Sequence, residues 1–119
     1  MTKILLAEDD DSMRAFLGRA LESAGYSVVS YGDGQTAYDR LCDESFDLLL
    51  TDIVMPEMDG IELARRATEI DPAMRVMFIT GFAAVALNPD SNAPKEAKVL
   101  SKPFHLKDLV NQVEQLLAA

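Results

Sequence analysis

The chain has 119 residues, 49% of them hydrophobic, which suits one compact domain with a sizeable core. Its formal net charge of −9 argues against binding to nucleic acid or to an anionic membrane surface, because both attract basic faces. No apolar run reaches the roughly 18 residues that span a bilayer, and the apolar start is too short for a secretory signal. We therefore expect a cytoplasmic protein with no membrane insertion. The single cysteine, Cys42, fits a reducing compartment, and we expect it to be a buried structural thiol.

The apolar pattern predicts short strands that alternate with helices. In chain order these are a strand over 3–7, a helix over 13–24, a strand over 27–31, a helix over 34–42, a strand over 46–51, a helix over 60–70, strands over 75–80 and 98–101, and a helix over 106–117. The third and fourth strands are apolar on both faces, which is typical of covered parallel strands. This alternation predicts an α/β fold in which helices cover both faces of a doubly wound parallel sheet.

Capping residues mark where the helices begin and end. Asp11 or Ser12 can cap the first helix, and Gly25 can end it. Asp59 can cap the third helix, with Glu62 completing a capping box.

The connection between the last two strands differs from the others. Residues 82–87 suit a short helix, but residues 88–94 contain two prolines and several turn formers. A regular helix cannot run through such a stretch, because proline lacks the backbone donor that a helix needs. We therefore expect an irregular fourth helix followed by a loop.

Polar side chains stand at the carboxyl ends of four of the predicted strands. Glu8 and Asp9 follow the first strand, Asp52 follows the third, Thr80 closes the fourth and Lys102 follows the fifth. In a sheet with the strand order 2-1-3-4-5, these ends meet at one edge, where ligands bind in such folds. Three carboxylates, one hydroxyl and one ammonium would then share one small site.

Three carboxylates in one site repel one another unless a cation neutralises them. Mg²⁺ is the natural cation, because it prefers oxygen ligands and leaves places for water and phosphate. The candidate ligands are Asp9, Asp52 and the backbone carbonyl of Val54, with Glu8 holding a bound water.

A carboxylate such as that of Asp52 can accept a phosphoryl group and form an aspartyl-phosphate. The transfer requires compensation of the charge on the phosphoryl oxygens. Mg²⁺ would take one oxygen, Lys102 a second as a point charge, and the Thr80 hydroxyl a third.

Four segments of the chain resemble those of bacterial response-regulator receiver domains. They are ILLAEDD at 4–10, TDIVMPEMDG at 51–60, ITG at 79–81 and LSKPF at 100–104. In this order and spacing they are highly specific, and the likeness covers essentially the whole chain. The resemblance implies a flavodoxin-like sheet of five strands in the order 2-1-3-4-5, and a single receiver domain over 1–119 with no output domain.

The resemblance also implies a role for each site residue. Asp52 would be the phosphoacceptor, and Thr80 and Lys102 would contact the phosphoryl group. The Lys102–Pro103 peptide bond would be cis. The metal would be held by Glu8, Asp9, Asp52 and the carbonyl of Val54. The chain departs from the family at Val99, where many receivers carry a Tyr or Phe, so we expect no switch based on a rotating aromatic ring.

In function, the resemblance implies a phosphorylation-controlled switch of a two-component phosphorelay. Such a domain is not an enzyme, and we expect no catalytic residues beyond those that assist its own phosphorylation. A histidine kinase or a histidine phosphotransferase would supply the phosphoryl group, and output would come through protein contact.

More narrowly, residues 50–87 and the end at Ala119 resemble a group of single-domain receivers of alphaproteobacteria. This implies that the unphosphorylated form serves an AAA+ protease of the ClpXP type, at a cell pole, as an adaptor between its cargo and a ClpX-type unfoldase. A phosphorelay intermediate or phosphate sink is the alternative. A stand-alone aspartyl-phosphate phosphatase fits less well, because such enzymes carry a second aspartate where this chain has Val54.

Overall fold

The computed structural model describes residues 1–81, 93–94 and 96–118. In chain order, the elements are β1 (Lys3–Ala7), α1 (Asp11–Ser23), β2 (Ser27–Tyr31), α2 (Gly34–Asp43), β3 (Leu48–Asp52), α3 (Gly60–Ile70), β4 (Arg75–Thr80), β5 (Lys98–Ser101) and α5 (Leu106–Ala118). The predicted short helix over 82–87 and most of the loop over 88–94 lie outside the described residues. Among the described helices, none combines the length and hydropathy of a bilayer-spanning segment.

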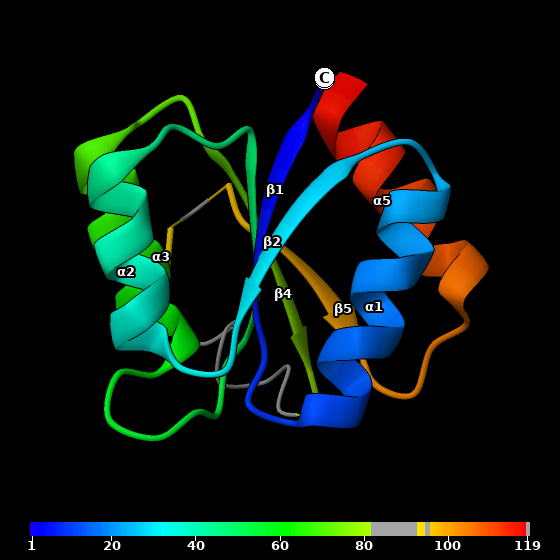
Figure 1. Cartoon of the computed structure of the whole chain (residues 1–119), viewed down its shortest axis with the longest axis horizontal. Coiled ribbons are helices and arrows are strands. Elements are labelled where there is room, and N and C mark those ends of the chain that lie inside the picture. The colour runs from blue at the N-terminus through cyan, green and yellow to red at the C-terminus, as the bar shows by residue number, and fades with distance from the viewer. Residues whose placement is uncertain (82–92, 95, 119) are drawn as a thin grey trace.

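The strands form one parallel sheet in the order β2-β1-β3-β4-β5, which is the order that the resemblance to receiver domains implies. Helices α2 and α3 cover one face of this sheet, and α1 and α5 cover the other (Figure 1). This is the doubly wound, flavodoxin-like arrangement, and its neighbouring strands run in the same direction because each is reached by a crossover.

Each face of the sheet carries its own apolar core, because successive strand residues point to opposite faces. In β1, Leu5 and Ala7 pack with residues of α2 and α3, whereas Ile4 and Leu6 pack with residues of α1 and α5. The same alternation continues in β3 and β4, so the central strands are buried on both faces. These two cores hold the carboxyl ends of β1, β3 and β4 in a fixed relation.

The third strand is shifted by comparison with the prediction of 46–51. It begins at Leu48 and ends at Asp52, whose partner in β4 is Ile79. Phe46 is buried outside the strand, where the Lys3 ammonium and the Arg40 guanidinium lie 5.3 and 5.9 Å from the centre of its ring. The ring therefore packs under two cations at the start of the sheet, and contributes a cation–π contact rather than a strand position.

Two helix caps agree with the sequence and one does not. Asp59 accepts a hydrogen bond from the Glu62 amide at the start of α3, and Gly25 follows the end of α1 with a φ of 101°. The cap of α1, however, is Asp10, which accepts from the Met13 amide, and not Asp11 or Ser12. Asp11 lies inside the first turn, where its carboxylate pairs with Arg14.

Cys42 is exposed, so the prediction of a buried thiol is wrong. The buried positions of α2 are Gly34, Ala37 and Leu41. Cys42 comes one residue after Leu41 and is therefore turned by about 100° away from the core. In α1, Phe16 lies at the margin of the apolar stripe and remains 49% exposed.

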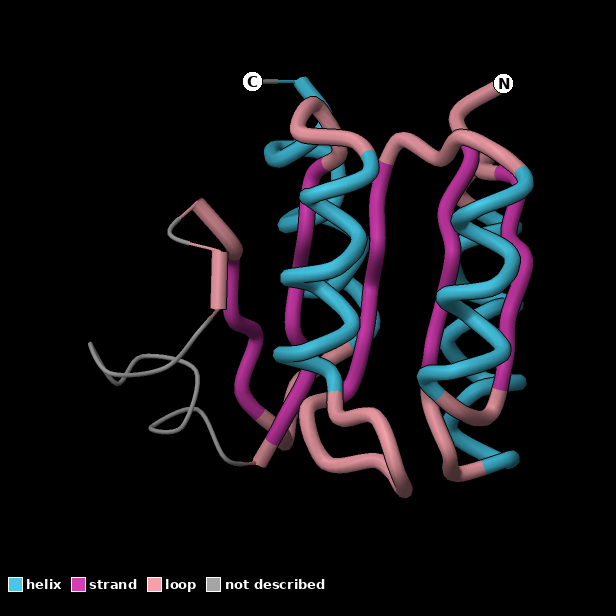
Figure 2. The backbone as a smooth tube through the Cα atoms, turned by 90° about the vertical axis from the view of Figure 1, so that its left-hand side faces the viewer, coloured by secondary structure: helices cyan, strands magenta, loops and turns pink. Residues whose placement is uncertain are grey.

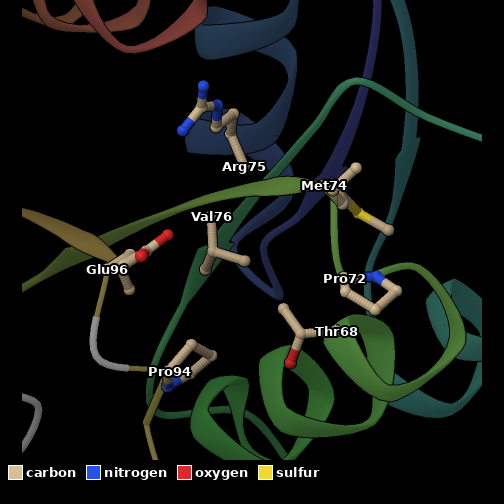
Figure 3. Close-up of a pocket in the computed structure, with 9 residues that line it drawn as sticks. Thr68, Pro72, Met74, Arg75, Val76, Pro94 and Glu96 are labelled. Carbon is tan, nitrogen blue, oxygen red and sulfur yellow. The ribbon is translucent and has the colours of Figure 1, made fainter. Parts of the chain in front are cut away.

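The two ends of the sheet differ in character. The strands are parallel, so their carboxyl ends lie at one end of the sheet. The amino terminus and the end of α5 lie at the opposite end (Figure 2). A pocket opens at this opposite end between Thr68 of α3, Val76 near the start of β4, and Pro94 and Glu96 (Figure 3). It is therefore separate from the cluster of polar residues at the carboxyl edge.

Candidate functional site

Strand register brings the predicted polar residues to one level of the sheet edge. Ala7 of β1 pairs with Thr51 of β3, so that Glu8 and Asp52, the next residues along, stand side by side. On the other side, Thr80 of β4 pairs with Ser101 of β5, and Lys102 follows. Acidic residues at the ends of β1 and β3 and a basic residue after β5 therefore lie at the carboxyl edge of the sheet.

Glu8, the first residue after β1, has a partner for its amide and for each of its carboxylate oxygens. Its amide donates to the Tyr31 carbonyl at 3.1 Å, and one carboxylate oxygen accepts from the Asp10 amide at 3.3 Å. The other carboxylate oxygen lies 3.4 Å from the Lys102 ammonium. Its side chain is only 1% exposed, so the carboxylate depends on these partners in place of water.

Asp52 is fixed through both of its carboxylate oxygens. Oδ1 accepts from the Ile53 amide at 2.7 Å, and Oδ2 accepts from the Lys102 ammonium at 3.0 Å. The residue as a whole is 8% exposed. The carboxylate is thus oriented by the backbone on one side and by a cation on the other.

The remaining predicted residues occupy different positions around this centre. Asp9 is exposed beside Glu8, and Thr80 is fully buried at the end of β4, where its carbonyl accepts from the Lys102 amide at 2.8 Å. Val54 lies two residues beyond Asp52 and is 55% exposed. The Lys102–Pro103 peptide bond is cis.

The acidic cluster fits a hard divalent cation. Glu8, Asp9 and Asp52 each offer a carboxylate oxygen, and these oxygens lie within 4.8 Å of one another. Oxygens bound to one Mg²⁺ can be up to about 4.2 Å apart, since each Mg–O bond is about 2.1 Å. The cluster therefore suits an ion held directly by two of the carboxylates, with the third reaching it through water.

The electrostatics of the site are dominated by the two buried carboxylates. Burial, and then the charge of Asp52, raise the pKa of Glu8 from its ordinary value of 4.5 to about 7, although Lys102 works in the opposite direction. Burial also works against the charge of Lys102, but the hydrogen bond to Asp52 and the charges of Glu8 and Asp52 raise the pKa of Lys102. One ammonium thus serves two acids and does not neutralise both.

This imbalance predicts a dependence of stability on pH in the ion-free protein. Between pH 4.5 and about 7, folded Glu8 retains a proton that the unfolded chain has released. The free energy of unfolding should therefore fall as the pH rises through this interval, by up to about 3 kcal/mol. Denaturant unfolding in EDTA across this pH range measures the effect. Glu8→Gln, which keeps the shape but cannot titrate, should remove that fall, and an equal fall in both proteins would contradict the assignment.

Two residues at the site were missed by the sequence analysis. The guanidinium of Arg14 donates to the Glu8 carbonyl at 2.8 Å, and a Cβ at Gly32 would come within 2.9 Å of it. Gly60 stands directly against the backbone of Asp52. Neither has a local signal, since Arg14 looks like an ordinary helix residue and Gly60 like a helix start.

Comparison with known proteins agrees with this geometry. The sequence profile of the response regulator receiver domain family matches residues 4–114. The chain is 71% identical to the response regulator receiver protein CpdR of Brucella abortus (strain 2308), over all of this chain and 99% of that protein. It is 30% identical to the sporulation initiation phosphotransferase F of Bacillus subtilis (strain 168), over 97% of this chain and 93% of that protein.

A solved structure shows the same architecture. The crystal structure of the receiver domain from the hybrid histidine kinase CckA superposes with a TM-score of 0.83 and 32% identity, covering 97% of this chain and 98% of that chain. Receiver domains of this kind are signalling domains of two-component systems. By its sequence, its sheet order and its acidic edge, the chain belongs to the response regulator receiver domain family.

Proposed function

We propose that the chain is a signalling switch that accepts a phosphoryl group on Asp52. The observation that supports this most directly is the position of the Asp52 carboxylate, which is nearly buried, lies within reach of Glu8 and Asp9, and contacts the Lys102 ammonium at 3.0 Å. A buried acid next to a cation and two further acids has little use in folding, because such clusters cost stability.

In the reaction, an oxygen of Asp52 forms a bond to phosphorus while the bond from phosphorus to the donor's nitrogen or oxygen breaks. The hydrogen bond from the Ile53 amide to Oδ1 leaves Oδ2 as the oxygen nearest to Lys102. The ammonium of Lys102 would then move from Oδ2 to an oxygen of the incoming phosphoryl group. Thr80, one strand away, would donate its hydroxyl to another.

We assign the metal site to Asp9, Asp52 and the carbonyl of Val54, with Glu8 acting through water. Mg²⁺ bound there would offset the negative charge of both the acids and the phosphoryl oxygens. Since Lys102 cannot neutralise two acids alone, the ion and the lysine have complementary roles.

The direct test is to incubate the protein with acetyl phosphate, in Mg²⁺ and in EDTA, and to locate the label by mass spectrometry. We expect a single phosphoryl group on the peptide that contains Asp52, labile to hydroxylamine, and formed only with Mg²⁺. Label on a different residue, or equal labelling in EDTA, would contradict the proposal.

For its output, we propose contact with another protein. Identity of 71% to CpdR over the whole chain supports a role as an adaptor that, when unphosphorylated, presents cargo to a ClpX-type unfoldase of an AAA+ protease in the cytoplasm, at a cell pole. A histidine kinase or histidine phosphotransferase would supply the phosphoryl group. In this scheme phosphorylation of Asp52 turns the delivery off.

A second candidate is a phosphorelay intermediate or phosphate sink. It is favoured by the 30% identity to a protein named as a phosphotransferase, over nearly the full length of both chains. A pull-down on purified unfoldase, with unphosphorylated and phosphorylated protein, distinguishes the two. Binding of only the unphosphorylated form supports the adaptor, whereas binding of neither form, together with transfer of label to a histidine phosphotransfer protein, supports the relay.

A further inference from the structure

Gly60, the first residue of α3, lies directly against the main chain of Asp52. Its amide donates to the Ile53 carbonyl at 2.8 Å. A Cβ at this position would overlap the carbonyl oxygen of Asp52, and would lie 2.8 Å from the Asp52 carbonyl carbon and 3.0 Å from the Ile53 Cα. All three are backbone atoms, which cannot rotate aside as a side chain could.

The need for glycine here is one of space and not of backbone conformation. Among the glycines of the described residues, only Gly25 has a positive φ. Gly60 adopts a conformation open to any residue, and the start of a helix gains nothing from glycine. The close approach to Asp52 is the feature that a larger residue cannot reproduce.

The loop between Asp52 and Gly60 is folded so that Gly60, at its end, contacts Asp52, at its beginning. Met55 and Met58 are buried in the core under α2 and α3, and Asp59 caps α3. Met58 is also bounded by Gly34 at the start of α2, where a Cβ would come within 2.5 Å of the Met58 carbonyl oxygen. After Asp52 the chain turns back, so that the first turn of α3 packs against the peptide group between Asp52 and Ile53.

We infer that Gly60 is a positioning residue for Asp52: its missing side chain sets the depth at which α3 meets the strand end, and so fixes the Asp52 carboxylate relative to Lys102, Glu8 and Asp9. The inference rests on the proposed role of Asp52 and deepens it. A small displacement of Asp52 would disturb the site, because its carboxylate lies 3.0 Å from the Lys102 ammonium and the carboxylate oxygens of the three acids already lie up to 4.8 Å apart.

The test compares Gly60→Ala with two controls in the full chain. Gly18→Ala adds the same methyl group in α1, where no atom lies within 4 Å of the new carbon. Leu63→Ala removes a fully buried side chain from α3 without adding an atom near Asp52, and so lowers stability by a different route. Each protein is labelled with acetyl phosphate in saturating Mg²⁺ at a temperature where it is folded.

We expect Gly60→Ala to slow labelling by about 100-fold, the effect of misplacing a reacting group by about 1 Å. Gly18→Ala and Leu63→Ala should stay within about twofold of the wild type when rates are expressed per folded molecule, since neither changes the site. The Ile53 amide proton, hydrogen-bonded to Asp52 Oδ1, should shift in the NMR spectrum of Gly60→Ala alone.

The outcomes separate this inference from the function on which it rests. A wild-type protein that takes no label contradicts the proposed function. A labelled wild type with Gly60→Ala at the same rate overturns the role of Gly60 and leaves the proposed function intact. A loss of rate in Leu63→Ala equal to that in Gly60→Ala also overturns it, because α3 would then act only through stability.

If Gly60→Ala does not fold, hydrogen exchange in the wild type decides the question. Saturation with Mg²⁺ at ten times its dissociation constant should slow exchange of the Gly60 amide up to about tenfold, if that amide opens only when Asp52 moves. The Ser27 amide, bonded to the Thr2 carbonyl at the far end of the sheet, is the control. Equal slowing of exchange at both amides, or no slowing at the Gly60 amide, overturns the inference.

Discussion

Replacing Asp52 by asparagine is expected to reduce phosphoryl labelling by acetyl phosphate to background. The amide group keeps an oxygen that can accept from the Ile53 amide, so the local fold should survive. The amide is not nucleophilic in the way that a carboxylate oxygen is, and it cannot form the acyl-phosphate bond. Intact-mass measurement after incubation with Mg²⁺ and acetyl phosphate provides the readout.

The matched control is Asp43→Asn, which makes the same chemical change at an exposed position in the last turn of α2. It should label like the wild type. Asp52→Asn should also lower the pKa of Glu8 toward its ordinary range, because the charge of Asp52 contributes to its elevation. Full labelling of Asp52→Asn would refute the assignment of the phosphoacceptor, whatever the effect on Glu8.

Replacing Lys102 by methionine should affect both stability and reaction. Its ammonium contacts two buried carboxylates, at 3.0 Å from Asp52 and 3.4 Å from Glu8. Their loss of a partner should cost about 2 kcal/mol of unfolding free energy at pH 8, less than the roughly 3–5 kcal/mol of a fully buried pair, because the lysine side chain is 30% exposed. Saturating Mg²⁺ should restore much of this, since the ion supplies the missing positive charge.

The same substitution should slow labelling by about 100- to 1000-fold in saturating Mg²⁺, the usual effect of removing one group that stabilises transition-state charge. Lys107→Met, at an exposed position of α5, makes the same change in charge and should leave both properties unchanged. Stability at pH 8 equal to that of the wild type in EDTA would show that Lys102 does not compensate the acids. An unchanged rate would remove Lys102 from the reaction.

Most of the fold follows from alternation that is visible in the chain. β1, β2, β4 and β5 have the predicted bounds, because each contains a short apolar stretch whose ends are marked by polar or turn residues. The exception is β3, where the apolar character of Phe46 suggested an early start. In the structure this ring packs against Arg40 and against Lys3, and Lys3 lies far from it in the sequence, so no local pattern reveals the contact.

For the site, too, some features can be predicted from the sequence and others appear only in the folded chain. The predicted strand ends alone place Glu8, Asp9, Asp52 and Lys102 at the carboxyl edge of the sheet, and the register brings these side chains together. The choice of Asp10 as the cap of α1 depends on one hydrogen bond, and Asp11 offers the same chemistry one residue later. Gly60 matters through a steric contact with Asp52, and such contacts exist only once the loop has closed.

The position of the chain ends has a practical consequence. Met1 is 93% exposed and lies at the end of the sheet where the strands begin, as Figure 2 shows. The five residues of β1 therefore separate it from the acidic edge by about 16 Å. A biotin or fluorophore coupled to the amino terminus would leave the acidic edge of the sheet open to the solution, so the protein can be immobilised on a sensor chip by this end to measure its binding to an unfoldase.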